Sequence, residues 1–295
     1  MRSIYQKISN KLGLSLFAMF AVAAMAVPQA HATSGNATIY NAVTVSYTAG
    51  ASTLTASASA TVTVATLGAQ PAVSISTAAA DVVTNDPYTL TVTVISNANG
   101  LDDYYTAVSS VNAGVGAPTG LAASVTSLNL WGGIVVTSVD GLISIPNGSE
   151  AGLTLGDTIR IGTTNYTVGT ITSGAAATGD GVGANAETYT TVAVAGLLAA
   201  DAPAGTPVGE VGTYTVSITN AGVPSTPGTN GTHTITTDVT PAATNLAGAA
   251  ITKVSVNSIL TVKSPSLSIT KVSDVTSAKP GANITYTITV KQWYI

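Results

Sequence analysis

The sequence has 295 residues, of which 45% are hydrophobic and only 7% charged, and it carries a formal net charge of −4 and no cysteine. A chain with this apolar content can bury a core, so its composition is not that of a disordered protein. Without cysteine, disulfide bonds, thiolate zinc sites and a cysteine nucleophile are excluded. The shortage of basic residues argues against nucleic acid or anionic lipid as a partner.

Residues 1–32 have the three parts of a secretory signal peptide. They carry the basic residues Arg2, Lys7 and Lys11, an apolar run from Leu14 to Val27, and the small-residue cleavage site Ala30-His31-Ala32. Removing this leader leaves six basic residues against 13 acidic ones. No later stretch reaches roughly 18 uninterrupted apolar residues, so no transmembrane segment is expected after the leader is removed. The sequence therefore predicts a secreted protein.

Short segments after the leader alternate apolar and small polar residues, which is the pattern of half-buried strands. No segment there shows a sustained helical periodicity, and clusters of Gly, Asn, Asp and Pro between the segments favour turns. We therefore predict an all-β fold built from sandwiches. The predicted strands include Ala42 to Tyr47, Ala60 to Val64, Tyr88 to Val94, Tyr166 to Ile171, Tyr214 to Ile218, and Ile284 to Val290.

One strand sequence occurs three times along the chain. Tyr88-Thr-Leu-Thr-Val-Thr-Val94 recurs as Tyr214-Thr-Val-Ser-Ile-Thr219 and as Tyr286-Thr-Ile-Thr-Val290. In each copy the tyrosine and the alternate aliphatic residues are expected to face a core and the threonines to face outward. Strands upstream repeat as well, because Ala60 to Val64 followed by Pro71 to Ile75 parallels Ile259 to Val262 followed by Pro265 to Ile269.

Two segments carry a family resemblance. Ser266 to Lys271, Lys279-Pro280-Gly281 and Ile284 to Val290 resemble the opening half of the conserved repeat known as domain of unknown function eleven, an Ig-like module of prokaryotic surface proteins. Asn41 to Tyr47 and Ala56 to Val64 resemble the closing strands of that module. The resemblance implies Ig-like β-sandwich modules on the surface of a prokaryote or outside the cell.

The predicted organisation follows from these repeats. Residues 33–66 supply N-terminal strands that match the closing half of a module, and residues 263–295 supply an incomplete C-terminal half-module. Residues 67–132 and 198–262 together are expected to form an Ig-like β-sandwich. Residues 133–197 depart from the family pattern and are expected to form a small β-rich insert, which could be a barrel.

Two assemblies would complete both half-modules. The N-terminal strands could fold back onto residues 264–295 of the same chain, giving a circularly permuted monomer. Alternatively, they could complete the C-terminal half-module of the next subunit, which is strand addition between chains. Such a contact is heterologous and generates a filament unless it closes into a ring. The residues expected at this contact are Val43, Val45, Tyr47, Val62, Val64, Tyr286, Ile288, Val290, Trp293, Tyr294 and Ile295.

The terminal cluster Trp293-Tyr294-Ile295 allows two interpretations. Trp and Tyr supply much contact energy per residue, so the cluster could anchor a subunit contact. The same side chains could instead plug the bottom of the local sandwich.

Candidates for chemistry are few. His233 alternates with Ile235 and lacks a nucleophile motif, so it is expected to be a surface histidine on a strand. Asp102 and Asp103 are adjacent, so they are expected to point to opposite faces and to belong to a solvated turn rather than a calcium site. The loop from Asp180 to Glu187 receives the same interpretation. We therefore expect no catalytic residue, metal or cofactor.

The expected function is a structural subunit of an extracellular filament or surface array that associates with itself. The alternative is a monomeric secreted protein of the adhesin type, with a ligand patch on the β-rich insert. A secreted enzyme ranks third, because the sequence shows no constellation of acid, base or metal-binding groups.

Overall fold

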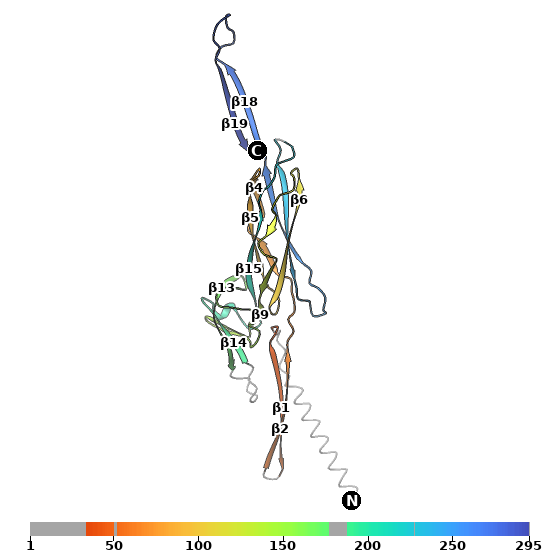
Figure 1. The fold of residues 1–295 in the computed structure, drawn as a ribbon. Coiled ribbons are helices and arrows are strands. Elements are labelled where there is room, and N and C mark those ends of the chain that lie inside the picture. The colour runs from red at the N-terminus through yellow and green to blue at the C-terminus, as the bar shows by residue number, and fades with distance from the viewer. Residues whose placement is uncertain (1–33, 50–51, 177–187, 227, 295) are drawn as a thin grey trace. The chain divides into compact units, whose positions relative to one another are not determined.

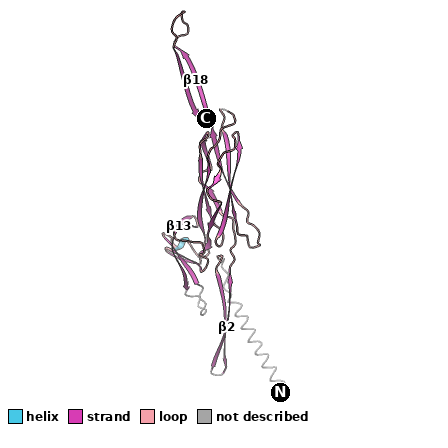
Figure 2. Cartoon of the chain, viewed as in Figure 1, coloured by secondary structure: helices cyan, strands magenta, loops and turns pink. Residues whose placement is uncertain are grey.

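The computed structural model describes residues 34–49, 52–176, 188–226 and 228–294. Strands make up almost all of the regular structure in these ranges, and the one helical element there is a single 3₁₀ turn, η1 (Ala199–Asp201) (Figure 2). The predicted all-β fold is therefore confirmed. Within the same ranges, no helix has the length and apolar character needed to cross a membrane.

The centre of the chain forms a β-sandwich (Figure 1). Its two sheets face each other across one hydrophobic core. One sheet has the order β3 (Ala72–Ile75), β5 (Tyr88–Ile95), β15 (Pro207–Ile218) and β7 (Ala122–Ala123). The other contains β4 (Ala79–Val83), β17 (Val254–Lys263), β16 (Gly231–Pro241), β6 (Asp102–Ala113) and β8 (Ser127–Leu130).

The sandwich core confirms the predicted alternation in the first two copies of the repeated strand. Leu90 and Val92 in β5, and Val216 and Ile218 in β15, are buried in one hydrophobic cluster. The intervening threonines Thr89 and Thr91 are exposed. β5 and β15 pair antiparallel in a register that sets Val92 opposite Tyr214, so the two copies contribute one continuous apolar layer.

The β-rich insert is built onto the long strand β15. Its path runs from β15 through β12 (Thr158–Ile161), β13 (Thr164–Ala176), β14 (Thr188–Val194) and β11 (Leu142–Pro146) to β10 (Thr137–Val139), while β9 (Gly132–Ile134) pairs separately with β15. Only Val135 and Val136 separate β9 from β10, and this run bonds β15 at one end and β11 at the other, so the sheet curls back on itself in the manner of the predicted barrel. The insert has its own hydrophobic cluster, in which Trp131 is fully buried.

The two terminal segments form separate antiparallel hairpins. The N-hairpin consists of β1 (Thr38–Ala49) and β2 (Ser52–Thr63), and the C-hairpin of β18 (Pro265–Ser273) and β19 (Tyr286–Tyr294). In the described part of the chain, each hairpin is a two-stranded sheet without a third strand. The fold-back of the N-terminal strands onto residues 264–295 of the same chain is therefore not present in this structure.

Equivalent positions of the strand repeat should respond differently to truncation. Leu90 is 3% exposed, whereas Ile288, its counterpart in the third copy, is 61% exposed. We expect Leu90→Ala to lower the free energy of unfolding by about 2–5 kcal/mol, because it leaves a cavity in a packed core. Ile288→Ala should change it by less than about 0.5 kcal/mol in the monomer. Urea unfolding followed by circular dichroism at low protein concentration measures both, and equal losses would contradict this picture of the core.

Candidate functional site

The C-hairpin has two chemically different faces. Its register pairs Ile269 with Val290 and Lys271 with Ile288, and successive residues of a strand point to opposite faces. One face therefore collects the apolar residues, and we call it the C-face: Leu267, Ile269, Tyr286, Ile288 and Val290. The opposite face consists of Ser268, Thr270, Val272, Thr287, Thr289, Lys291 and Trp293.

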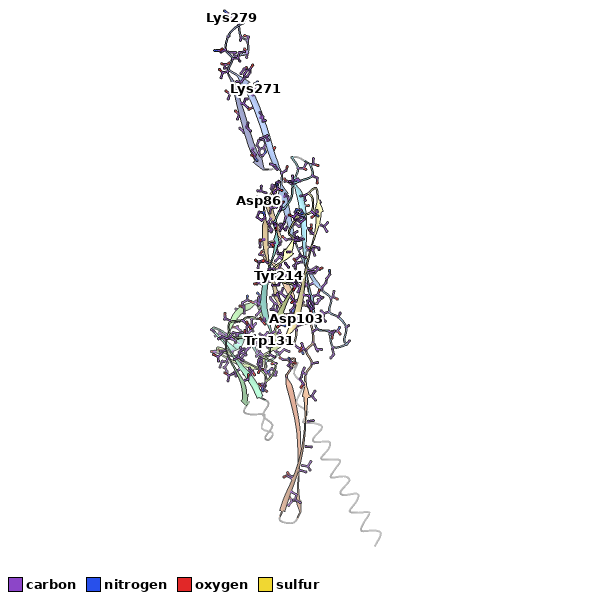
Figure 3. The ribbon with its side chains drawn as sticks, in the orientation of Figure 1. Asp86, Asp103, Trp131, Tyr214, Lys271 and Lys279 are labelled. Atoms are coloured by element: carbon purple, nitrogen blue, oxygen red, sulfur yellow. The ribbon has the colours of Figure 1, made fainter. Side chains whose placement is uncertain are left out.

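The C-face is open to solvent along its whole length. Leu267, Ile269, Ile288 and Val290 are each more than half exposed, and Tyr286 is 51% exposed. Lys271 shares this face, with its Nζ 4.0 Å from the centroid of the Tyr286 ring (Figure 3). A lysine stem over an aromatic ring shields part of the tyrosine but leaves the aliphatic residues uncovered.

The predicted contact residue Trp293 lies on the other side of the hairpin. It pairs with Ser266, which puts it on the face opposite Ile288 and Val290, and it is 45% exposed. The structure thus does not bring Trp293 together with the C-face. An exposed tryptophan also does not plug a local sandwich core. The side chains of Tyr294 and Ile295 lie outside the described residues.

The N-hairpin also has one apolar face and one polar face. Its register pairs Val45 with Ala56 and sets the position of Tyr47 opposite Leu54. Among the described side chains, one face collects the apolar residues, and we call it the N-face: Val45, Leu54, Ala56, Ala58, Ala60 and Val62. All six are exposed. The other face carries Ser46, Thr48, Thr55 and Thr63. The side chains of Val43 and Tyr47 lie outside the described residues.

Val64, the remaining predicted contact residue, belongs to the base of the N-hairpin. Its N–H donates to the carbonyl oxygen of Ala37 and its own carbonyl accepts from the N–H of Asn36, both at 2.9 Å. Val64 is half-buried, and β2 ends one residue before it. The structure therefore separates Val64 from the exposed strands and gives it a part in closing the hairpin.

The base of the N-hairpin is tied to the sandwich and the insert. Ser34 is fully buried and its Oγ accepts from the N–H of Ile134 at 3.1 Å. The N–H of Gly35 donates to the carbonyl of Asn99, whose side-chain Oδ1 accepts from the N–H of Leu67 at 2.6 Å. These hydrogen bonds fix the base of the N-hairpin. Its strands contact no third strand among the described residues.

The C-hairpin is joined to the sandwich through one residue, Ser264, which separates β17 from β18. Ser264 is buried, its N–H donates to Asn230 Oδ1 at 3.0 Å, and its Oγ accepts from the N–H of Gly228 at 3.1 Å. Both hydrogen bonds hold the junction against the loop that precedes β16. A strand of the core therefore passes almost directly into a strand of the exposed hairpin.

His233 corrects the sequence-based prediction of a surface histidine. It is fully buried, because it is in phase with Ile235 and Val239 on the inward-facing side of β16. Its Nδ1 lies 2.8 Å from Asn112 Oδ1 and its Nε2 lies 2.7 Å from the carbonyl oxygen of Ala221. Both ring nitrogens are engaged with neighbouring strands and loops, so the imidazole links parts of the sandwich.

Asp102 and Asp103 point apart, as their adjacency predicts, but the expected solvated turn is wrong for Asp102. This residue begins β6 and is 4% exposed, and its Oδ1 accepts from the N–H of Ala243 at 2.9 Å. Burial raises the pKa of the Asp102 carboxyl. Asp103 accepts from Asn129 Nδ2 at 2.8 Å. The sequence alone assigns Asp102 to a turn, but the start of β6 packs against residues 242–243, and this packing buries the Asp102 carboxyl.

Metal-binding geometry is not found in the described ranges, where no three His, Asp or Glu side chains gather in a way that could hold an ion. The loop from Asp180 to Glu187, for which the sequence predicts a solvated turn, lies outside the described residues.

A groove of about 560 Å³ lies where the insert meets the sandwich. It is lined by the Asn97–Asn99 turn, by β9 and β12 residues and by the start of β15, and Arg160 supplies its positive charge. Arg160 Nε donates to Asn165 Oδ1 at 2.8 Å. This groove gives the β-rich insert a concave surface next to a guanidinium group, which is a second candidate site.

Glu210 lies beside this junction, on β15. Its Oε2 accepts from the backbone N–H of Trp131 at 2.8 Å. Burial raises the pKa of this carboxyl to about 7, and the nearby Asp157 adds to the increase, whereas the hydrogen bond from Trp131 opposes it. The hydrogen bond holds the start of the insert against the shared strand.

No family model, no curated protein and no solved structure matches the chain. The resemblance to the Ig-like repeat family thus stays a prediction from sequence.

Glu210 predicts a pH dependence of stability. Its pKa is about 7 in the folded state against a usual value of 4.5, so the folded protein binds the proton more tightly than the unfolded chain. This group's contribution to the free energy of unfolding is therefore fully present below about pH 4.5 and is lost as the pH rises towards 7. Urea unfolding at pH 5 and pH 8 should show this loss in the native sequence and a smaller one in Glu210→Gln. An equal pH dependence in both proteins would contradict the assignment.

Proposed function

We propose that the protein is a structural subunit of an extracellular filament or surface array, assembled from N-terminus to C-terminus by strand complementation. In this assembly the N-hairpin of one subunit completes the C-hairpin of the next. The observation that carries the proposal is the pair of terminal two-stranded sheets, each with one exposed apolar face and an opposite face rich in Ser and Thr, which in the C-hairpin also carries Val272 and Trp293.

The energetic argument starts from the isolated hairpins. A two-stranded sheet is at best marginally stable in water on its own, and contiguous exposed apolar patches usually mark interaction sites. Covering one Val, Leu or Ile side chain stabilises a contact by about 1.5–3 kcal/mol. The C-face alone offers Leu267, Ile269, Ile288 and Val290 for such burial. A partner sheet of similar size would therefore gain enough to offset part of the cost of association.

The geometry of the assembly follows from the use of two different surfaces. A contact between the N-face and the C-face is heterologous, because each subunit contributes a different patch. It propagates into an open filament unless the rotation between subunits closes a ring. The signal peptide predicted in residues 1–32 supports export, and the sparse charge of the chain suits a packed structural role.

A non-catalytic role is part of this proposal. The buried His233 and Asp102 are engaged with backbone and side-chain partners in the sandwich, which is support for a structural use of both groups.

The second candidate function is that of a monomeric secreted protein of the adhesin type. The groove next to Arg160 is the observation that favours it, because it combines a concave shape with a positive charge and polar backbone turns. The two functions differ in one property, which is self-association.

Complementary deletions test the proposed assembly. One variant replaces residues 38–63 by an Asn-Gly turn, which the hydrogen-bonded pair of Ala37 and Val64 can accommodate. The other variant ends at Ser264. The intact mature protein should form polymers, each variant alone should be monomeric, and their mixture should give a 1:1 heterodimer. Light scattering coupled to size exclusion, with negative-stain microscopy of the intact protein, measures these states.

The doubly deleted protein is the matched control and should remain monomeric in every mixture. A monomeric intact protein that shows no association at high concentration would remove the filament proposal and leave the adhesin-type function. Homodimers of either single variant would contradict the N-terminus to C-terminus contact, because they would show that a hairpin pairs with its own copy.

A further inference from the structure

The sandwich contains the kind of contact that the two hairpins lack, which is the packing of one sheet against another. β19 repeats the sequence of β5, since Tyr286-Thr-Ile-Thr-Val290 corresponds to Tyr88-Thr-Leu-Thr-Val92. β18 corresponds to β3, with Pro265 to Ile269 matching Pro71 to Ile75. The C-hairpin is therefore a second copy of the strand pair β3 and β5, and both pairs are antiparallel.

The N-hairpin corresponds to the strand pair β16 and β17 through the sequence of its second strand and its position before a proline-led strand. Ala60 to Val64 in and after β2 parallels the end of β17, which aligns Val62 with Leu260. Both pairs are antiparallel, and in both the second strand leads towards a strand that begins after a proline, Pro71 or Pro265. Each hairpin thus has an intact counterpart inside the sandwich.

Within the sandwich, these two counterparts stack face to face. β3 and β5 belong to one sheet and β16 and β17 to the other. No ladder of backbone hydrogen bonds therefore joins the first pair to the second. Their contact is made by side chains, because Leu90, Val92, Leu260 and Val262 are all buried in the same hydrophobic cluster. The sheets of such a sandwich pack about 10 Å apart.

The corresponding positions of the hairpins are exposed. Ile288 and Val290 take the places of Leu90 and Val92, and Val62 takes the place of Leu260. Leu90 is 3% and Leu260 0% exposed, whereas Ile288 and Val62 are each 61% exposed. The difference between the copies is therefore the presence of a facing sheet.

We infer that the N-face of one subunit stacks on the C-face of the next, in the way that β16 and β17 stack on β3 and β5 within the sandwich. This inference rests on the proposed self-association and gives strand complementation a specific form, in which the donated hairpin supplies the facing sheet and not an added edge strand. The occupant of the C-face is the N-hairpin of a second copy. The contact forms a four-stranded minimal sandwich and leaves the threonine-rich faces in solvent.

The alternative arrangement is pairing along the strand edges. An edge contact would extend the C-hairpin into a longer sheet by backbone hydrogen bonds. It would leave most of the C-face exposed, because a strand added at the edge contacts only the side chains of the neighbouring strand and does not cover the face of the sheet. Stacking covers both apolar faces at once.

The composition of the two faces fits stacking. Residues 38–63 contain no charged side chain, so the N-hairpin can be covered without burying a charge. On the C-face, Lys271 is the charged residue, and its Nζ already lies over the Tyr286 ring. Trp293 and Lys291 lie on the opposite face and remain outside the stacked surface.

Neighbouring residues of one strand provide a matched test of the face. Ile288→Asp places a carboxylate on the C-face, and Thr289→Asp places the same group on the opposite face. With the two complementary deletion variants, Ile288→Asp should weaken the heterodimer by about 30-fold or more, the loss expected for a residue at the centre of an interface. Thr289→Asp and Trp293→Ala should change its dissociation constant by less than about threefold. Val62→Asp and Thr63→Asp form the corresponding pair on the N-hairpin.

Because the chain has no cysteine, single cysteines report directly on which face is covered. Ile288→Cys should lose most of its reactivity with a maleimide when the heterodimer forms, whereas Thr289→Cys should keep it. A heterodimer in which both cysteines stay reactive, or in which Thr289→Asp is as harmful as Ile288→Asp, would overturn stacking while the proposed assembly stands. The absence of any heterodimer between the unsubstituted deletion variants would overturn the proposed assembly itself.

Discussion

A two-stranded amphipathic sheet cannot cover its own apolar face, and the organisation of this chain depends on that constraint. In the centre of the chain, each sheet of the sandwich covers the other, and the aliphatic residues of the repeated Tyr-Thr-aliphatic strand are buried. In the terminal hairpins the same alternation is present without a facing sheet, so the aliphatic residues of β19 stay in solvent. The sequence pattern is the same in both places and only the tertiary context differs.

The long strand β15 shows how the chain combines two cores with one backbone. Its C-terminal part pairs with β5 and places Val216 and Ile218 in the sandwich, and its N-terminal part pairs with β9 and β12 and places Val208 in the insert. Glu210 is the last residue of the part that pairs with β12, and it accepts a hydrogen bond from Trp131, the residue with which the path into the insert begins. The insert is thus an extension of one sandwich sheet.

Much of this fold can be predicted from the sequence, because strand periodicity and repeats are local signals. The sandwich strands and their inward residues, such as Leu90 and Val216, follow from alternation alone. Register is not a local signal. Alternation along β19 already puts Trp293 out of phase with Ile288 and Val290, which treating residues 293–295 as one cluster overlooks, whereas its partner Ser266 is set by the register. The burial of His233 and Asp102 depends on which residues of other strands and loops cover them, such as Asn112 and Ala243, and these partners are distant in sequence.

The connections of the hairpins bear on how such a subunit would carry tension. The N-hairpin leads into β3 and then β4, and the C-hairpin leaves directly from β17 through Ser264. β4 and β17 are neighbours and parallel, with Ala79 to Val83 opposite Ile259 to Lys263. When two parallel strands are pulled, one from its N-terminal end and the other from its C-terminal end, they must slide along each other, so their hydrogen bonds are loaded together and not one after another. Side-chain contacts across this pair, from Thr84 Oγ1 to the carbonyl of Lys263 at 2.8 Å and from Lys263 Nζ to Asp81 at 3.4 Å, lie at the end of β17 where the load would leave. The strand order of the sandwich therefore places the parallel pair β4 and β17 between the two connections of the proposed filament, with the antiparallel pair β3 and β5 ahead of it on the N-terminal side.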